Sequence, residues 1–218
     1  KADGGTDSFT GIHAIAGTAG DDTLDGSGAA AGFYVLSLEG RAGADIIIGN
    51  GGHGVQVSYA ASPAAVLVDL HAGTAQDGWG GTDTLVNLRR VAATSAWADT
   101  VLGSAQDDLF LSGANGNKTF DGRAGMDEWR YVGTGNVTVN LNSTRFGDVV
   151  QGAYALKPGG TDRLAGIEIV GGGSGHDSIT GSAAAESLAG GMGDDTLDGG
   201  GGHDIVFYDY LSAGAPLR

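Results

Sequence analysis

The last third of the chain repeats a nine-residue pattern four times in strict register. The units are GGSGHDSIT, GSAAAESLA, GGMGDDTLD and GGGGHDIVF, which together cover residues 172–207. Each unit has an acidic residue at its sixth position and an aliphatic residue at its eighth. Glycine permits a tight turn with positive φ, an acidic residue in that turn can face a cation, and an apolar residue on a following short strand points inward. The pattern therefore predicts an all-β chain, a parallel β-roll or β-solenoid with glycine-rich, calcium-binding turns.

A longer repeat encloses the short one. The tetrapeptide GGTD occurs at Gly4–Asp7, Gly80–Asp83 and Gly159–Asp162, with spacings of 76 and 79 residues. We therefore divide the chain into three copies, residues 1–79, 80–158 and a truncated 159–218, within one continuous elongated domain. A tyrosine closes the nonapeptide block of each copy, and we expect it to pack there: Tyr59, Tyr131 and Tyr208. The chain then reads as a piece of a longer tandem array.

The first two copies contain degenerate nonapeptides. In the first, Leu36 and Gly54 occupy two of the four acidic slots and supply no carboxylate; in the second, Asn117 occupies one slot and offers an amide oxygen. The expected metal ligands are the side chains of Asp22, Asp45, Asp99, Asp108, Asp127, Asp177, Glu186, Asp195 and Asp204. Backbone carbonyls in the third copy would complete the oxygen shell, from Gly172, Gly175, Gly190, Gly193, Gly199 and Gly202. The aspartates of the GGTD turns, Asp7, Asp83 and Asp162, either cap a turn or bind a further calcium ion.

The repeat length predicts how the carboxylates are arranged. Nine residues make one strand and one turn, so two units complete a coil, and acidic residues 18 apart stack about 4.8 Å apart on the same edge. The predicted stacked pairs are Asp22 with Asp45, Asp99 with Asn117, Asp108 with Asp127, Asp177 with Asp195, and Glu186 with Asp204. Stacked aspartates repel one another without a cation, so we expect metal binding and folding to be coupled. At 18 residues a coil, the chain has room for about a dozen coils.

Composition supports this interpretation. Of 218 residues 43 are glycine, and 26 acidic residues face 11 basic ones, giving a formal net charge of −15. Such an acidic chain is a poor partner for nucleic acid or an anionic membrane, and no apolar run approaches the ~20 residues of a membrane span. The chain has no cysteine, which excludes disulfides and thiol chemistry.

These nonapeptides resemble the repeats-in-toxin family, the hemolysin-type calcium-binding repeats of secreted bacterial proteins. The resemblance is carried by residues 17–25, 40–57, 99–130 and 172–207. It implies a right-handed parallel β-roll, several bound Ca²⁺ ions, a secreted or cell-surface location, and folding triggered by calcium after export. It implies no single activity, because such repeats occur in toxins, enzymes, adhesins and surface-layer proteins.

Two functional classes follow, with a weaker third. The first is a structural segment of a secreted or surface protein, whose partners are neighbouring copies or other solenoid chains. The second is an accessory folding or secretion module of a secreted enzyme or toxin. The third, a solenoid that binds or acts on surface polysaccharide, depends on the trio Glu128, Trp129 and Arg130. We expect no catalytic residue.

The histidines fit the same interpretation. His53, His176 and His203 each occupy the fifth position of a nonapeptide, which we interpret as a polar turn position. His13 and His71 lie outside the nonapeptides without a partner at a spacing that indicates catalysis.

Overall fold

The chain folds into two large sheets of short strands. The computed structural model describes residues 8–29, 35–93, 95–142, 144–146 and 149–208. Sheet A contains, in spatial order, β1 (Ala14–Ala16), β3 (Leu36–Glu39), β5 (Val55–Ser58), β9 (Arg90–Ala93), β11 (Leu109–Ser112), β13 (Glu128–Tyr131), β19 (Ile169–Gly173), β21 (Ser187–Gly191) and β23 (Ile205–Val206). Sheet B contains β2 (Thr23–Asp25), β4 (Ile46–Ile48), β8 (Thr82–Val86), β7 (Thr74–Gln76), β6 (Leu67–Asp69), β10 (Thr100–Leu102), β12 (Thr119–Asp121), β18 (Gly160–Ala165), β17 (Tyr154–Lys157), β14 (Thr138–Asn140), β20 (Ser178–Thr180) and β22 (Thr196–Asp198). A separate hairpin pairs β15 (Thr144–Phe146) with β16 (Val149–Gln151).

Within the nonapeptide blocks the chain alternates between the two sheets, one strand in each. Every pairing within sheet A is parallel, and β20 pairs in parallel with β22 in sheet B. The described residues contain no helix, and so no apolar helix long enough to cross a bilayer. The expected all-β fold is therefore confirmed, with two mostly parallel sheets that are consistent with a β-solenoid.

The main core is a single file of apolar side chains between the sheets, and Ala92, Leu109 and Leu111 on sheet A form a small second cluster. The middle residue of each short strand points inward, as its neighbours on either side are more exposed; Val101 and Ile179 are examples from sheet B. Larger side chains fill the middle of the molecule, where the rings of Phe110 and Phe120 stack with centroids 5.7 Å apart. Trp129 and Tyr131 are also fully buried there. Such a file is only one side chain deep, so each coil depends on its neighbours for burial.

Two three-strand meanders interrupt the parallel order of sheet B. In the first, β6, β7 and β8 pair antiparallel with one another, while β8 pairs in parallel with β4 and β6 with β10. The second repeats this plan with β14, β17 and β18. The expectation of a wholly parallel solenoid is thus wrong, because the chain reverses twice between nonapeptide blocks. The first strand of each meander, β6 or β14, lies in a segment whose apolar residues alternate, Val66–Leu70 and Val137–Leu141 respectively.

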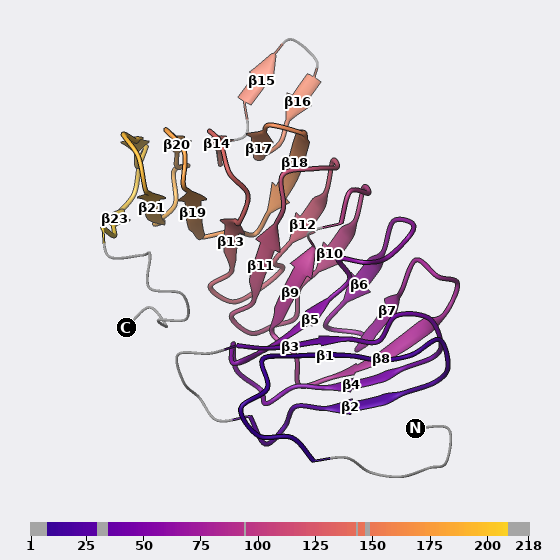
Figure 1. Cartoon of the computed structure of the whole chain (residues 1–218). Helices are drawn as coiled ribbons and strands as arrows, with labels where there is room; N and C mark the ends of the chain where they lie inside the picture. Colours follow the sequence, from indigo (N-terminus) through magenta and orange to yellow (C-terminus); the bar gives the residue numbers. More distant parts are fainter. Residues whose placement is uncertain (1–7, 30–34, 94, 143, 147–148, 209–218) are drawn as a thin grey trace.

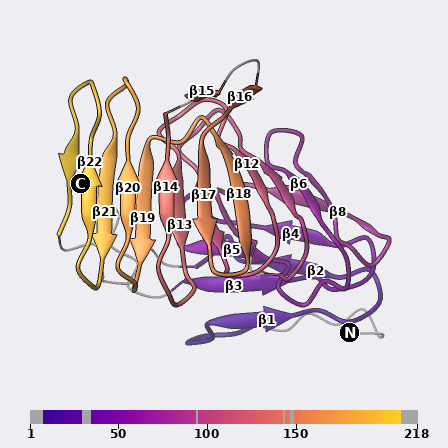
Figure 2. The ribbon, with the colours of Figure 1, turned by 90° about the horizontal axis from the view of Figure 1, so that it is seen from above.

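The meanders also give the molecule its curved shape. Sheet B gains two strand spacings at each meander, about 9.6 Å, that sheet A lacks. The coils on either side must then tilt apart, and both views show β1 and β3 lying at a large angle to β19 and β21 (Figure 1, Figure 2). The meanders use residues that would otherwise form coils, so sheet A has nine strands rather than about a dozen.

The tyrosines that close the blocks do not all pack alike. Tyr59 and Tyr131 are buried, as expected, whereas Tyr208 is 90% exposed. Tyr208 lies beyond β23, the last strand of sheet A, where no further described coil covers it.

Truncating Trp129 tests the single-file core. We expect Trp129→Ala to lower the free energy of unfolding by about 3–5 kcal/mol, because it removes a fully buried ring from a core one side chain deep. Trp79→Ala, which truncates a 47% exposed ring, should change stability by less than about 1 kcal/mol. Urea unfolding of both variants under conditions where the wild type is folded makes the comparison. Equal losses would contradict the assigned core.

Candidate functional site

Carboxylates join one coil to the next along both edges of the solenoid. The backbone N–H of Asp22 donates to Asp45 Oδ1 (2.8 Å), and that of Asp177 donates to Asp195 Oδ1 (2.9 Å). The same bond links further coils: Asp45 to Asp83, Asp108 to Asp127, Asp127 to Glu168, Glu186 to Asp204, Val66 to Asp99 and Val137 to Asp177. One carboxylate oxygen of each coil is thereby used to hold the neighbouring strand.

Four of the five predicted stacked pairs are brought together in this ladder. The exception is Asp99 with Asn117. The register of β10 and β12 pairs Thr100 with Thr119, which places Lys118 and not Asn117 beside Asp99. The turn before β12 has one extra residue, which shifts the repeat by one position. Lys118 therefore occupies the position at which the neighbouring coils carry an acidic residue.

In the first copy, the two repeat positions that lack an acidic residue lie at or next to the residues predicted from the sequence. Leu36 begins β3 and pairs with Val55, so the second empty slot is Val55 rather than Gly54. The enlarged unit expected near residues 29–33 lies mostly outside the described residues.

The GGTD aspartates are not in turns. Asp83 lies on β8 and Asp162 on β18, and both are fully buried. Asp83 accepts from the backbone N–H of Asp45 (3.1 Å) and from the Tyr59 hydroxyl (2.9 Å). Both carboxylates are therefore hydrogen-bonded from strand positions, where neither caps a turn, and the alternative of a further calcium ion stays a prediction. Asp7 lies outside the described residues.

One group of turns is closed by a hydroxyl. Four residues before the acidic residue stands a Ser or Thr whose hydroxyl donates to that carboxylate, as Ser104 Oγ does to Asp108 Oδ2 (3.0 Å). The backbone N–H two residues further on then donates to the hydroxyl, as Gln106 does to Ser104 (3.1 Å). The closed turns are those of Asp22 with Thr18, Asp99 with Ser95, Asp108 with Ser104, and Glu186 with Ser182. In each of these turns the hydroxyl thus partners the carboxylate, although Asp108 keeps one oxygen, Oδ1, without a partner.

The other group of turns is left open. Here the residue four before the acidic residue has a positive φ, such as Arg41 (74°) or Gly191 (109°), and carries no hydroxyl. In most of these turns the residue two before the acidic one also has a positive φ, as Gly193 does (116°). The open turns end at Asp45, Asp127, Asp177, Asp195 and Asp204.

Open turns contain buried carboxylate oxygens with no hydrogen-bond partner. Asp45 Oδ2, Asp127 Oδ2 and Asp177 Oδ2 are all of this kind, and their side chains are at most 2% exposed. Two further oxygens without partners belong to Asp77 and to the closed-turn residue Asp108. Burying an ionised oxygen with nothing to bind is costly, so these positions call for a cation or a proton.

Glycine makes room for these oxygens. A Cβ at Gly172 would collide with Asp177 Oδ2 and with the carbonyl oxygen of Gly190 in the next coil. The same is true at Gly122, with Asp127 Oδ2 and the carbonyl oxygen of Gly166, whereas a Cβ at Gly40 would collide with Asp45 alone. The carboxylate oxygen and a neighbouring carbonyl oxygen therefore face the same small space, and that is the mixture of ligands that Ca²⁺ accepts.

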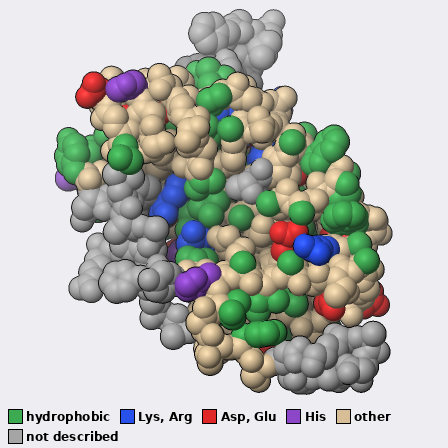
Figure 3. Space-filling view, viewed as in Figure 1, with side chains coloured by type: hydrophobic (Ala, Val, Ile, Leu, Met, Phe, Trp, Pro, Cys, Tyr) green, Lys and Arg blue, Asp and Glu red, His purple; other side chains and the backbone are tan. Residues whose placement is uncertain are grey.

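Burial makes these acids weak. Desolvation raises the pKa of Asp83 to about 6 and the pKa of Asp127 to about 7, against an ordinary 3.8. It also raises the pKa of Asp45, Asp108, Asp162 and Asp177. On the face seen in Figure 3 few carboxylates are visible, in keeping with an acidic chain that buries much of its charge.

Among the described residues, no three histidine or acidic side chains come together as a metal cluster. A cation at an open turn would therefore take one or two carboxylates and depend on backbone carbonyls for the rest. That composition suits calcium better than zinc, which prefers a small set of His, Cys or acidic side chains.

The residues considered for sugar binding or catalysis make contacts within the fold instead. Trp129 is fully buried, so it offers no face to a sugar, and Arg130 donates to Glu128 Oε1 (2.8 Å) on the same strand. His176 accepts from the backbone N–H of Asp194 (2.8 Å), and His53 Nε2 lies 2.9 Å from the Asp107 carbonyl oxygen. Both histidines take part in contacts between turns.

Compared with protein-family models and with curated proteins, the chain matches none of them.

The raised pKa values predict how the metal-free protein responds to pH. In chelator, the folded state binds more protons than the unfolded state between about pH 4 and 7, so the free energy of unfolding should fall as pH rises. The fraction of folded protein in chelator at pH 5 and at pH 8, measured by far-UV circular dichroism, gives the direction of this pH dependence. Asp127→Asn should reduce this pH dependence, and the variant should be more stable than the wild type at pH 8. A wild type that gains stability from pH 5 to 8 without metal would contradict the burial of these acids.

Gly172→Ala tests the crowded space in an open turn. The added methyl group collides with Asp177 and the next coil, so we expect a loss of about 1–3 kcal/mol and weaker cation binding. The matched control is Gly28→Ala, where the methyl group meets nothing within 4 Å. Thermal unfolding measures the loss of stability in both variants. A Gly172→Ala protein as stable as the Gly28→Ala control would argue against a tight site.

Proposed function

We propose that this chain is a calcium-binding structural segment of a secreted or cell-surface protein, built as a right-handed β-roll that folds when calcium binds. The observation that carries the proposal is the set of buried carboxylate oxygens without partners at Asp45, Asp127 and Asp177. Each lies in an open turn of a chain with a net charge of −15, and those of Asp127 and Asp177 share their space with a neighbouring carbonyl oxygen.

The open turns are the proposed sites, with Asp45, Asp127, Asp177, Asp195 and Asp204 as side-chain ligands. The hydroxyl-closed turns of Asp22, Asp99, Asp108 and Glu186 then serve as structural turns, although their sequences follow the same repeat. A site with one or two carboxylates and several carbonyls binds calcium weakly, in the range of extracellular modules, about 10⁻⁴–10⁻³ M. That affinity favours a protein that folds outside the cell.

A structural role is supported by how the acidic residues are used. The carboxylates of the repeat positions either join coils or face the space of an open turn. We favour a spacer or assembly unit, similar to the repeats-in-toxin segments of adhesins and surface layers, over an accessory module of an enzyme or toxin. An upstream catalytic domain in the parent reading frame would favour the accessory module.

Calcium should convert the chain from a poorly ordered to a β-rich state. Far-UV circular dichroism with chelator and with millimolar Ca²⁺ measures this change, and Mg²⁺ should substitute poorly because it demands a rigid octahedral shell. Identical spectra in chelator and in calcium would overturn the proposal.

Calorimetric titration assigns the sites. Asp177→Asn should reduce the number of bound calcium ions, because it removes the charge of an oxygen that has no other partner. Glu186→Gln is the matched control from a closed turn of the same copy, where Ser182 already binds the carboxylate. It should leave the stoichiometry unchanged. Equal losses in both variants would refute the division into open and closed turns.

A further inference from the structure

Two lysine ammonium groups lie fully buried in the middle of the molecule. The sequence has three lysines, and the side chains of Lys118 and Lys157 are both 0% exposed. A buried ammonium group is costly unless its three donors are all used and a charge of opposite sign lies beside it. Here both conditions are met.

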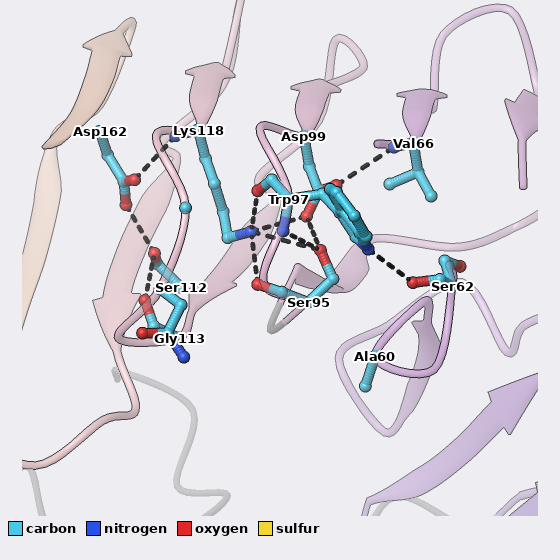
Figure 4. Close-up of polar contacts among 12 residues, drawn as sticks. Ala60, Ser62, Val66, Ser95, Trp97, Asp99, Ser112, Gly113, Lys118 and Asp162 are labelled. Atoms are coloured by element: carbon cyan, nitrogen blue, oxygen red, sulfur yellow. Dashed lines mark hydrogen bonds and ion pairs between the residues drawn. The ribbon is translucent and has the colours of Figure 1, made fainter. Parts of the chain in front are cut away.

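Lys118 immediately precedes β12, and its side chain reaches into the turn that ends at Asp99. Its Nζ donates to the carbonyl oxygens of Ser95 (3.0 Å) and Trp97 (2.9 Å) and to Asp99 Oδ2 (2.7 Å). Figure 4 shows the side chain pointing into this ring of oxygens. The ammonium group is thus surrounded by turn carbonyls and one carboxylate.

Lys157 fills the next turn in the same way. From β17 its Nζ donates to the carbonyl oxygens of Gly113 (2.9 Å), Asn115 (3.2 Å) and Gly116 (2.9 Å). Asp162 Oδ1 lies 3.0 Å away and supplies the negative charge. The ligands are again backbone carbonyls and one carboxylate.

The charge order of the ladder changes at this point. Asp22, Asp45 and Asp83 stack as three acids in a row, whereas Asp99, Lys118 and Asp162 alternate in sign. Neither Asp99 nor Asp162 has a buried oxygen without a partner, unlike Asp45 and Asp177. The lysine ammonium groups therefore supply here the positive charge that the carboxylates of the open turns lack.

We propose that Lys118 and Lys157 are built-in cations that occupy two turn sites in place of a metal, so that β10, β12 and β18 are held together without calcium. This inference depends on the proposed function for its contrast with the flanking coils. Its own content concerns the lysines alone: the edge of sheet B at which these strands begin is neutralised from within the chain. Asp127 lies at the opposite edge, in the turn between β12 and β13, and remains a proposed calcium ligand there. The middle of sheet B is then metal-independent, and the metal-dependent coils extend from it in both directions.

Hydrogen exchange of the wild-type protein tests this first. In chelator, amides of Thr100–Leu102 and Thr119–Asp121 should exchange at least tenfold more slowly than those of Ile46–Ile48 and Ser178–Thr180, and calcium should narrow the difference. Equally fast exchange in all four strands in chelator would overturn the proposal.

Two substitutions at Lys118 test the site itself. Lys118→Ala leaves Asp99 and the carbonyl oxygens around an open space, so protection of β10 and β12 should be lost in chelator and regained in calcium. Lys118→Met fills the space with an uncharged chain, so protection should be lost in chelator and not regained. Full protection of either variant in chelator, or equal recovery of both in calcium, would refute the role of the ammonium group.

The outcome separates this inference from the proposed function. If calcium changes nothing in the wild type but both variants lose protection of β10 and β12 in chelator, the lysine cations stand while the calcium role fails. If calcium orders the flanking strands but Lys118→Ala remains protected in chelator, the calcium role stands and the built-in cations fail.

Discussion

The structure depends on carboxylates that reach from one coil to the backbone of the next. Backbone hydrogen bonds within each sheet join neighbouring strands, but the turns at the edges would separate without a further contact. The bonds from Asp22 N–H to Asp45 and from Asp177 N–H to Asp195 supply it, and they recur along both edges. Charge-assisted hydrogen bonds of this kind are stronger than neutral ones. Their drawback is a column of like charges about one strand spacing apart, which must be protonated, bound to a cation or interrupted by a base.

Different positions along the column deal with this charge in different ways. Burial raises the pKa of Asp127 to about 7, which favours protonation when no cation is bound. In the closed turns a serine or threonine hydroxyl donates to the carboxylate. At Lys118 the chain inserts a positive charge into the column itself. The same nine-residue pattern thus contains turns with quite different needs for a cation.

Much of the fold could be predicted from the nonapeptide period, because a strand of three residues and a glycine turn leave little choice of geometry. The stacked pairs followed from the 18-residue coil, and Asp177 with Asp195 obeys it directly. The meanders could not be predicted, because a short strand such as Thr74–Gln76 has the same alternation whether its partner is parallel or antiparallel. The slot of Lys118 was missed because a turn with one extra residue looks like an unshifted unit with Asn117 in the acidic position. The difference between open and closed turns does have a sequence signal, the residue four before the acid, but its meaning depends on hydroxyl geometry that only the structure displays.

The two meanders recur at nearly the spacing of the GGTD tetrapeptide, and each adds two strands to the same sheet. A tilt applied once per copy, always in the same sense relative to the coil, accumulates. An array of such copies would therefore wind into a superhelix whose pitch is fixed by the number of coils between meanders. Lengthening or shortening a nonapeptide block by one coil would change the path of the whole filament in space while leaving every turn chemically intact.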